Sequence, residues 1–162
     1  MGEVIKVGMA DWKVCSGDDG ATTLGLGSCV GVAIRDPQSG IGGLAHVMLP
    51  DSRETANNTN RSKFADTAIA DMVAEMVKKG ANMAKMTAKI AGGAQMFAFG
   101  SAKSDMVRVG ERNVEACLKK LKELKIPVTA SDTGENYGRT VIFYPKDGNY
   151  IIRAVGKPEK SI

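Results

Sequence analysis

The fold is decided by one stretch of the sequence, VGVAIRDPQSGIGGLAHVML, which covers residues 30–49. Two runs in it, Val30–Arg35 and Ile41–Leu49, are rich in aliphatic and β-branched residues and are typical of strands. Between them stands Asp-Pro-Gln-Ser-Gly, in which proline fixes φ and glycine permits a positive φ. The stretch therefore predicts an antiparallel β-hairpin.

Patterns on both sides of the hairpin predict further strands and two helices. Apolar residues recur at intervals of three and four over Lys63–Lys79, with Ser62 as a candidate N-cap and Gly80 as a stop, and again over Glu111–Leu124. Short β-rich runs indicate strands at residues 4–9, 12–15, 86–91, 128–131, 140–144 and 150–155. Residues 51–60 are polar and predict a loop, and residues 157–162 carry no structural signal. With no internal repeat and no linker, we expect one layered α/β domain, residues 1–162, of about six to eight strands.

The composition is that of an ordinary globular domain. The 162 residues include 22 Lys and Arg against 18 Asp and Glu, a net charge of +4, and 43% of them are hydrophobic. The basic residues are scattered, and their densest run, at residues 119–125, suits a solvated helix face, so nucleic-acid binding is not expected. The chain has neither an apolar run of about 18 residues nor a signal peptide, so we expect no membrane insertion and a cytoplasmic location.

Three cysteines and a single histidine restrict the chemistry that the chain can carry. The cysteines have no close paired spacing, which disfavours a disulfide framework and a zinc site, and we expect no cofactor. Gly92-Gly93 lacks the spacing of a phosphate-binding loop and predicts a tight bend. Cys15, on an early strand, and Cys117, on an apolar helix stripe, are expected to be packing residues. His46 is the only imidazole available to an active site.

The predicted hairpin brings this histidine toward Cys29. A tight turn that pairs Asp36 with Ser39 places Cys29 directly opposite His46. A loop two residues longer pairs Cys29 with Met48 and leaves His46 diagonal to the cysteine on the same face, whereas a shift of one residue separates them onto opposite faces. Two of these three registers therefore let a thiol and an imidazole meet.

A thiol beside an imidazole is a useful pair, because a neighbouring imidazolium lowers the pKa of the thiol and the thiolate is the nucleophile. His46 can then protonate a leaving amine, provided that the Thr22-Thr23 segment fixes its tautomer. Backbone amides around Ser28 and Cys29 are candidates for stabilising an oxyanion. The arrangement indicates acyl transfer from an amide or ester. On spacing alone the opposite interpretation stays open, in which Cys29 and His46 are ordinary buried residues.

Several motifs, in order along most of the chain, resemble those of one protein family. They are TLGLGSCV at residues 23–30, RDP at 35–37, AHVMLPDS at 45–52, KFAD at 63–66, KIAGGA at 89–94, GERN at 110–113 and DTGEN at 132–136. The family is that of the chemoreceptor glutamine deamidases, the CheD family. The resemblance implies an α/β fold of β-sandwich-like mixed sheets flanked by helices, similar to the catalytic domain of the cytotoxic necrotizing factor deamidases.

The resemblance also implies an activity and the residues that carry it. Cys29 would be the nucleophile, His46 the general base and acid, and Thr23 the group that orients the histidine. The thiol would attack the side-chain amide of a chemoreceptor glutamine, ammonia would leave, and water would release glutamate from the thioester. The product can be methylated, which serves adaptation in chemotaxis.

The resemblance implies partners as well. Family members bind a chemotaxis phosphatase of the CheC type, and Gln95-Met96-Phe97 is an apolar candidate for that contact if it is exposed, with packing in the core as the alternative. We expect chemoreceptor cytoplasmic helices as the substrate and a monomer when the protein is free. One alternative function is a regulatory module that binds the phosphatase and has a secondary hydrolase site, and another is a thiol protease.

Overall fold

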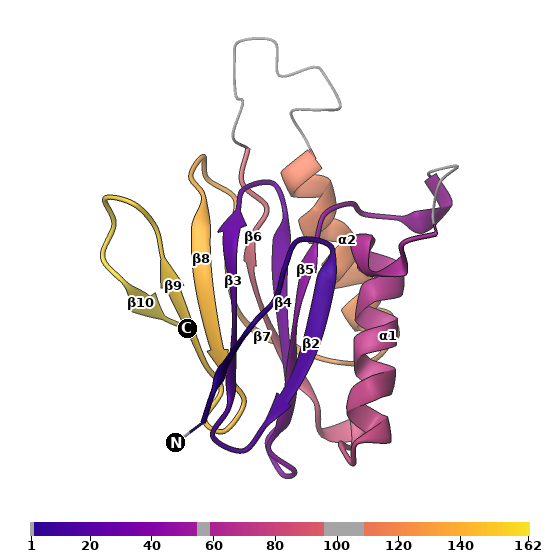
Figure 1. Ribbon diagram of the computed structural model, residues 1–162. Helices are drawn as coiled ribbons and strands as arrows, with labels where there is room; N and C mark the ends of the chain where they lie inside the picture. The colour runs from indigo at the N-terminus through magenta and orange to yellow at the C-terminus, as the bar shows by residue number, and fades with distance from the viewer. Residues whose placement is uncertain (1, 55–58, 96–108) are drawn as a thin grey trace.

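Figure 1 shows the computed structural model, which describes residues 2–54, 59–95 and 109–162. None of the helices in these ranges is long and apolar enough to cross a membrane. The described residues form two five-stranded sheets and two α-helices. The first sheet has the strand order β1-β3-β8-β9-β10, and the second has the order β2-β5-β4-β6-β7. The expected α/β architecture of mixed sheets flanked by helices is therefore confirmed.

The two sheets interleave along the chain. The first sheet consists of β1 (Val4–Lys6), β3 (Gly20–Leu26), β8 (Arg139–Tyr144), β9 (Asn149–Arg153) and β10 (Lys160–Ser161). The second sheet consists of β2 (Asp11–Ser16), β4 (Val30–Asp36), β5 (Ile41–Val47), β6 (Thr87–Gly92) and β7 (Val128–Thr133). The helices are α1 (Ala65–Lys78) and α2 (Val109–Glu123). The first sheet thus joins the two ends of the chain, while the second is built from its middle.

The second sheet lies between the first sheet and the two helices (Figure 1). All seven residues of β5 are buried, because both faces of this strand are covered. On the helix side, Ala45 packs with Met72 and Met76 of α1. On the other side, Leu44 packs between the sheets with Phe143 of β8. Since successive side chains of a strand point to opposite faces, His46 shares the inter-sheet layer with Leu44.

The β4-β5 hairpin has the wider of the turns that the sequence allows. Asp36 pairs with Ile41, so the tight register with Asp36 opposite Ser39 is wrong. The carboxylate of Asp36 accepts a hydrogen bond from the amide of Gln38 in the loop and another from the amide of Asn82, each at 2.9 Å. These two bonds hold the longer loop in place, and one of them comes from a residue far along the chain.

Other predictions differ from the structure at the edges of elements. Ser62 does not cap α1, because it lies in a short 3-10 helix whose N-cap is Asn60, and α1 begins only at Ala65. The carboxyl end is ordered as β10, which pairs with β9. The sequence also does not predict β3, because its glycines interrupt the alternation of apolar and polar side chains. Together, β3 and β10 bring the number of strands to ten in the described ranges, above the expected six to eight.

Candidate active site

Thr23 and His46 meet in the layer between the two sheets. Thr23 lies on β3 and His46 on β5, and they are 1% and 0% exposed. The Thr23 Oγ1 atom lies 2.6 Å from His46 Nδ1. The neighbouring Thr22 instead donates its hydroxyl to the carbonyl oxygen of Val141 at 2.7 Å. The structure therefore places Thr23, and not Thr22, against the histidine, a choice that spacing alone left open.

The hydrogen bonds of Thr23 fix the tautomer of His46. The Thr23 hydroxyl donates to the carbonyl oxygen of Val7 at 2.8 Å. A hydroxyl has one proton to donate, so its oxygen accepts the other bond from Nδ1–H of His46. Nδ1 therefore carries the proton of the neutral ring, and Nε2 keeps its lone pair. Nε2 is buried and has no partner among the described residues, which is the state that a general base needs.

Cys29 lies at the edge of the same layer, one residue before β4. It is 8% exposed and belongs to the inter-sheet cluster that contains Ala33 and Leu44. Gly31 is the ladder partner of His46, so Cys29 stands two residues along the chain from the position opposite the histidine. This is the diagonal arrangement that the wider hairpin loop predicts. The structure thus brings all three predicted site residues to one layer.

The Gly92-Gly93 bend fixes the backbone of Cys29. The amide of Gly93 donates to the carbonyl oxygen of Cys29 at 2.8 Å. Gly92 has a φ of +107°, and a Cβ atom there would lie 2.3 Å from the same oxygen, so no larger residue fits. The predicted tight bend is confirmed, and it holds the residue that carries the thiol.

Burial keeps both titratable groups of the site neutral. It raises the pKa of the Cys29 thiol above its usual 9.0 and lowers the pKa of His46 below its usual 6.5. At neutral pH the site therefore holds a thiol and a neutral imidazole. The expectation that an imidazolium lowers the pKa of the thiol is not met in the resting site. The arrangement instead suits removal of the thiol proton by His46 during the attack itself.

The amides of Ser28 and Cys29 are the predicted oxyanion donors. In the part of the chain that the structure describes, neither amide donates to a backbone carbonyl. Donors at such a position are able to bind charge that develops on a substrate oxygen.

The other two cysteines have the properties of packing residues. Cys15 and Cys117 are both buried and form no disulfide. Burial raises the pKa of Cys15 to about 11 and that of Cys117 to about 12. A thiol whose pKa is raised so far carries almost no thiolate at neutral pH and is a poor nucleophile.

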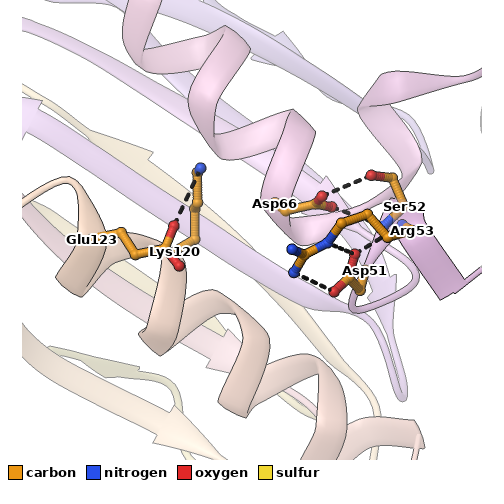
Figure 2. Close-up of polar contacts among 6 residues, drawn as sticks. All are labelled: Asp51, Ser52, Arg53, Asp66, Lys120 and Glu123. Carbon is orange, nitrogen blue, oxygen red and sulfur yellow. Dashed lines mark hydrogen bonds and ion pairs between the residues drawn. The ribbon is translucent and has the colours of Figure 1, made fainter.

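A charged cavity of about 400 Å³ lies between the segment that follows β5 and helices α1 and α2. Figure 2 shows six polar residues in and around it: Asp51, Ser52, Arg53, Asp66, Lys120 and Glu123. The Arg53 guanidinium donates two hydrogen bonds to the Asp51 carboxylate and lowers its pKa to about 2. Neither Cys29 nor His46 lines the cavity. Its lining holds four acidic and four basic residues, among them the ion pairs Asp51–Arg53 and Lys120–Glu123, and this balance favours no ligand of one sign. The described ranges hold no group of three or more His, Cys, Asp or Glu placed to bind a metal ion.

Two further residues contact the site, and no sequence pattern assigns either of them that contact. Val7 contributes only its backbone carbonyl to Thr23, which no side-chain pattern reveals. Asn113 of α2 donates hydrogen bonds to the backbone on both sides of the site, at Ser28 and Met48. The GERN motif contains Asn113, but the motif alone assigns it no contact.

A family model described as CheD chemotactic sensory transduction matches residues 48–154 of the chain. The matched range includes α1, β6, α2, β7, β8 and β9, and it begins two residues after His46. It therefore covers the part of the chain that follows Thr23, Cys29 and His46 in the sequence.

Several relatives match over the whole length of the chain. The probable chemoreceptor glutamine deamidase CheD of Lachnoclostridium phytofermentans is 57% identical over 162 residues, which are 100% of this chain and 100% of that protein. The protein of the same name from Moorella thermoacetica is 49% identical, over 98% of this chain and 95% of that protein. The chemoreceptor glutamine deamidase CheD of Halalkalibacterium halodurans is 47% identical, over 100% of both.

A crystal structure of the hypothetical protein YfiH of Bacillus licheniformis aligns with 70% of this chain and 51% of its own, at 20% identity and a TM-score of 0.37. That likeness is too partial to bear on the fold. The sequence matches are of a different order, because they cover the site and the scaffold together. By these matches and by the family model, the chain belongs to the CheD family.

Proposed function

We propose that residues 1–162 form a single cysteine-dependent deamidase domain that converts glutamine side chains of chemoreceptors to glutamate. The relatives described above are named chemoreceptor glutamine deamidases. The observation that carries the proposal for this chain is the bare Nε2 of His46, whose tautomer is set by Thr23. Cys29 is the nucleophile, His46 the general base and acid, and Thr23 the residue that orients the imidazole.

The first half of the reaction forms a thioester. Nε2 of His46 takes the thiol proton as the Cys29 Sγ atom attacks the carbon of the glutamine side-chain amide. The oxyanion of the tetrahedral intermediate lies against the amides of Ser28 and Cys29. The imidazolium then gives its proton to the amide nitrogen, the carbon–nitrogen bond breaks, and ammonia leaves.

The second half consumes water and restores the thiol. Nε2 of His46 takes a proton from a water molecule as the water oxygen attacks the thioester carbon. The carbon–sulfur bond breaks, the proton returns to sulfur, and the product is glutamate. These steps use one thiol, one imidazole and water, and the proton count is the same at the end as at the beginning.

Mass spectrometry of a purified receptor cytoplasmic fragment tests the proposal. The wild-type protein is expected to convert specific glutamines to glutamate with release of ammonia, and Cys29→Ala is expected to abolish the conversion. Cys15→Ala is the matched control, because it removes another buried thiol from the same inter-sheet layer. It is expected to keep the activity.

Two results would contradict the deamidase assignment. Unchanged glutamines with wild-type protein, beside a tight complex with a phosphatase, would favour the regulatory module instead. Cleavage of the receptor backbone would favour a thiol protease.

The remaining expectations belong to this proposal as well. The family resemblance implies a CheC-type phosphatase as partner, the protein is expected to be a monomer when free, and the lack of an apolar span and of a signal peptide in the sequence predicts a cytoplasmic location. Of the proposed phosphatase contact Gln95-Met96-Phe97, Met96 and Phe97 lie outside the described residues. Running the same assay with and without a phosphatase of this type measures whether such a partner raises or lowers the rate.

A further inference from the structure

Asn113 ties together the two backbone segments that carry the site. It lies on α2, is 0% exposed, and its Nδ2 atom donates to the carbonyl oxygens of Ser28 and Met48, each at 2.9 Å. Ser28 directly precedes Cys29, and Met48 follows His46 by two residues. A side-chain amide has two N–H donors, and both are used here.

The two bonds lie where the ladder between β4 and β5 stops. Val30 and Val47 form its last pair, and Ser28 and Met48 lie just beyond it on the two strands. Asn113 therefore bridges the strands at the point where they no longer bond to each other. Helix α2 comes this close because Gly110 packs on the glycine bend, where an added Cβ would lie 2.5 Å from the carbonyl oxygen of Gly93.

The bond to Ser28 determines where the Cys29 amide points. A trans peptide unit is planar, with its C=O and N–H in opposite directions. Holding the Ser28 carbonyl toward α2 therefore aims the Cys29 N–H away from the helix. The next peptide unit is fixed as well, because the Gly93 amide donates to the Cys29 carbonyl at 2.8 Å. Both peptide units that flank the thiol are thus held, one of them by Asn113.

The chemistry of the contact requires an amide at position 113. Both neighbours are carbonyl oxygens, so an ionised carboxylate would be repelled and an aliphatic side chain would leave them without donors. The remaining Oδ1 atom of Asn113 is buried and has no partner in the described residues. A buried acceptor without a donor is unfavourable for stability and unusual in folded proteins.

We propose that Asn113 is a positioning residue of the active site, which holds the Cys29 amide in the oxyanion-binding direction and fixes Cys29 relative to the His46 strand. The inference rests on the proposed function, because the amide matters only if Cys29 forms a tetrahedral intermediate. Asn113 does not touch the reacting atoms. It acts on the rate through the backbone of the nucleophile.

Kinetics of Asn113→Asp and Asn113→Ala test the proposal, with Cys117→Ala as the matched control. Cys117 lies one helical turn further along α2 and is also 0% exposed, so its removal disturbs the same helix without touching the site. At temperatures where every variant is folded, we expect kcat for receptor deamidation to fall about tenfold to hundredfold in both Asn113 variants. KM is expected to change less than about threefold, because substrate contacts are kept. Cys117→Ala is expected to stay within about threefold of wild type in both constants.

Hydrogen exchange of the peptide that contains Cys29 gives a second measurement, which needs no substrate. We expect faster exchange at this peptide in both Asn113 variants, with β8 and β9 unchanged, and no such local effect in Cys117→Ala. The proposal is overturned if the Asn113 variants keep the wild-type kcat, or if Cys117→Ala loses as much. If wild-type protein deamidates nothing, the proposed function fails. Hydrogen exchange at the Cys29 peptide then decides by itself whether Asn113 holds the backbone at Cys29.

Discussion

The two faces of β5 do different work. On the helix face, Ala45 and Val47 pack into an apolar cluster with Met72 and Met76 of α1. On the inter-sheet face, the same strand carries His46, whose ring bonds to Thr23 through one nitrogen and leaves the other without a partner among the described residues. One strand thus borders both an apolar layer against α1 and the inter-sheet layer that contains the candidate catalytic residues.

The difference separates the source of stability from the source of activity. Burying apolar surface stabilises a fold roughly in proportion to its area, whereas burying a polar atom without a partner costs free energy. The inter-sheet layer accepts that cost at His46 Nε2, and Asn113 Oδ1 on α2 is a second buried atom of this kind, on the helix side of the sheet. The apolar cluster between α1 and β5 offsets the cost. Substitutions in the two layers should therefore affect different measurements.

The largest effect is expected from His46→Gln, in the inter-sheet layer. Glutamine can still bond to Thr23 but cannot carry a proton between thiol, substrate and water. We expect the deamidation rate to fall about a thousandfold or more, as is usual for loss of a general base. The thermal midpoint should change little at pH 8. If the deamidation rate falls only in proportion to the amount of folded protein, then His46 serves stability and not catalysis, and the contrast between the two layers is wrong.

A second substitution, Met72→Ala, addresses the helix layer. Met72 is 0% exposed and lies over the glycine at position 43 of β5, where an added Cβ would be 2.8 Å from its sulfur. We expect the free energy of unfolding to fall by about 2–5 kcal/mol, measured by urea denaturation. The deamidation rate per folded molecule should remain that of wild type. Met83→Ala is the control, because Met83 is 41% exposed and should cost little.

Thr23→Val is expected to have a smaller effect, on the orientation of His46. Valine keeps the shape of threonine but removes the acceptor that holds the proton on Nδ1. We expect the deamidation rate to fall about tenfold to hundredfold, or about 1.4–2.8 kcal/mol of transition-state stabilisation. Because the chain has a single histidine, its imidazole ¹⁵N resonances report the tautomer without ambiguity. Thr23→Ser keeps the hydroxyl and should keep both the rate and the spectrum, and a wild-type spectrum in Thr23→Val would contradict the role.

The sequence predicts which residues of the hairpin share a face better than it predicts the length of the loop that joins the two strands. Strand alternation puts Cys29 and His46 on one face of the hairpin in two of the three registers that the sequence allows. The loop length does not follow, because the Asp36 carboxylate is held by the amide of Asn82, far along the chain. A contact between distant segments leaves no local pattern.

Thr23 shows a different limit. Adjacent threonines point to opposite faces, so choosing between Thr22 and Thr23 requires the parity of β3. That parity is obscured by a register shift between Thr23 and Leu26, where Gly25 takes a φ of +68°. The family resemblance supplied the choice, and the hydrogen bond to His46 agrees with it. The carbonyl of Val7 has no sequence signature at all, because every residue has one.

The pH dependence of stability gives the smallest effect and tests the cost of the inter-sheet layer directly. Burial lowers the pKa of His46 in the folded protein below its usual 6.5, so the unfolded chain binds more protons between those two values. Stability is therefore full above about pH 6.5 and falls as the pH drops through that window, by at most about 1.4 kcal/mol per pH unit. Urea denaturation between pH 7 and pH 5 should show this slope in wild type and not in His46→Gln. Parallel slopes in the two proteins would mean that the buried imidazole of His46 is not the cause of the loss of stability at low pH.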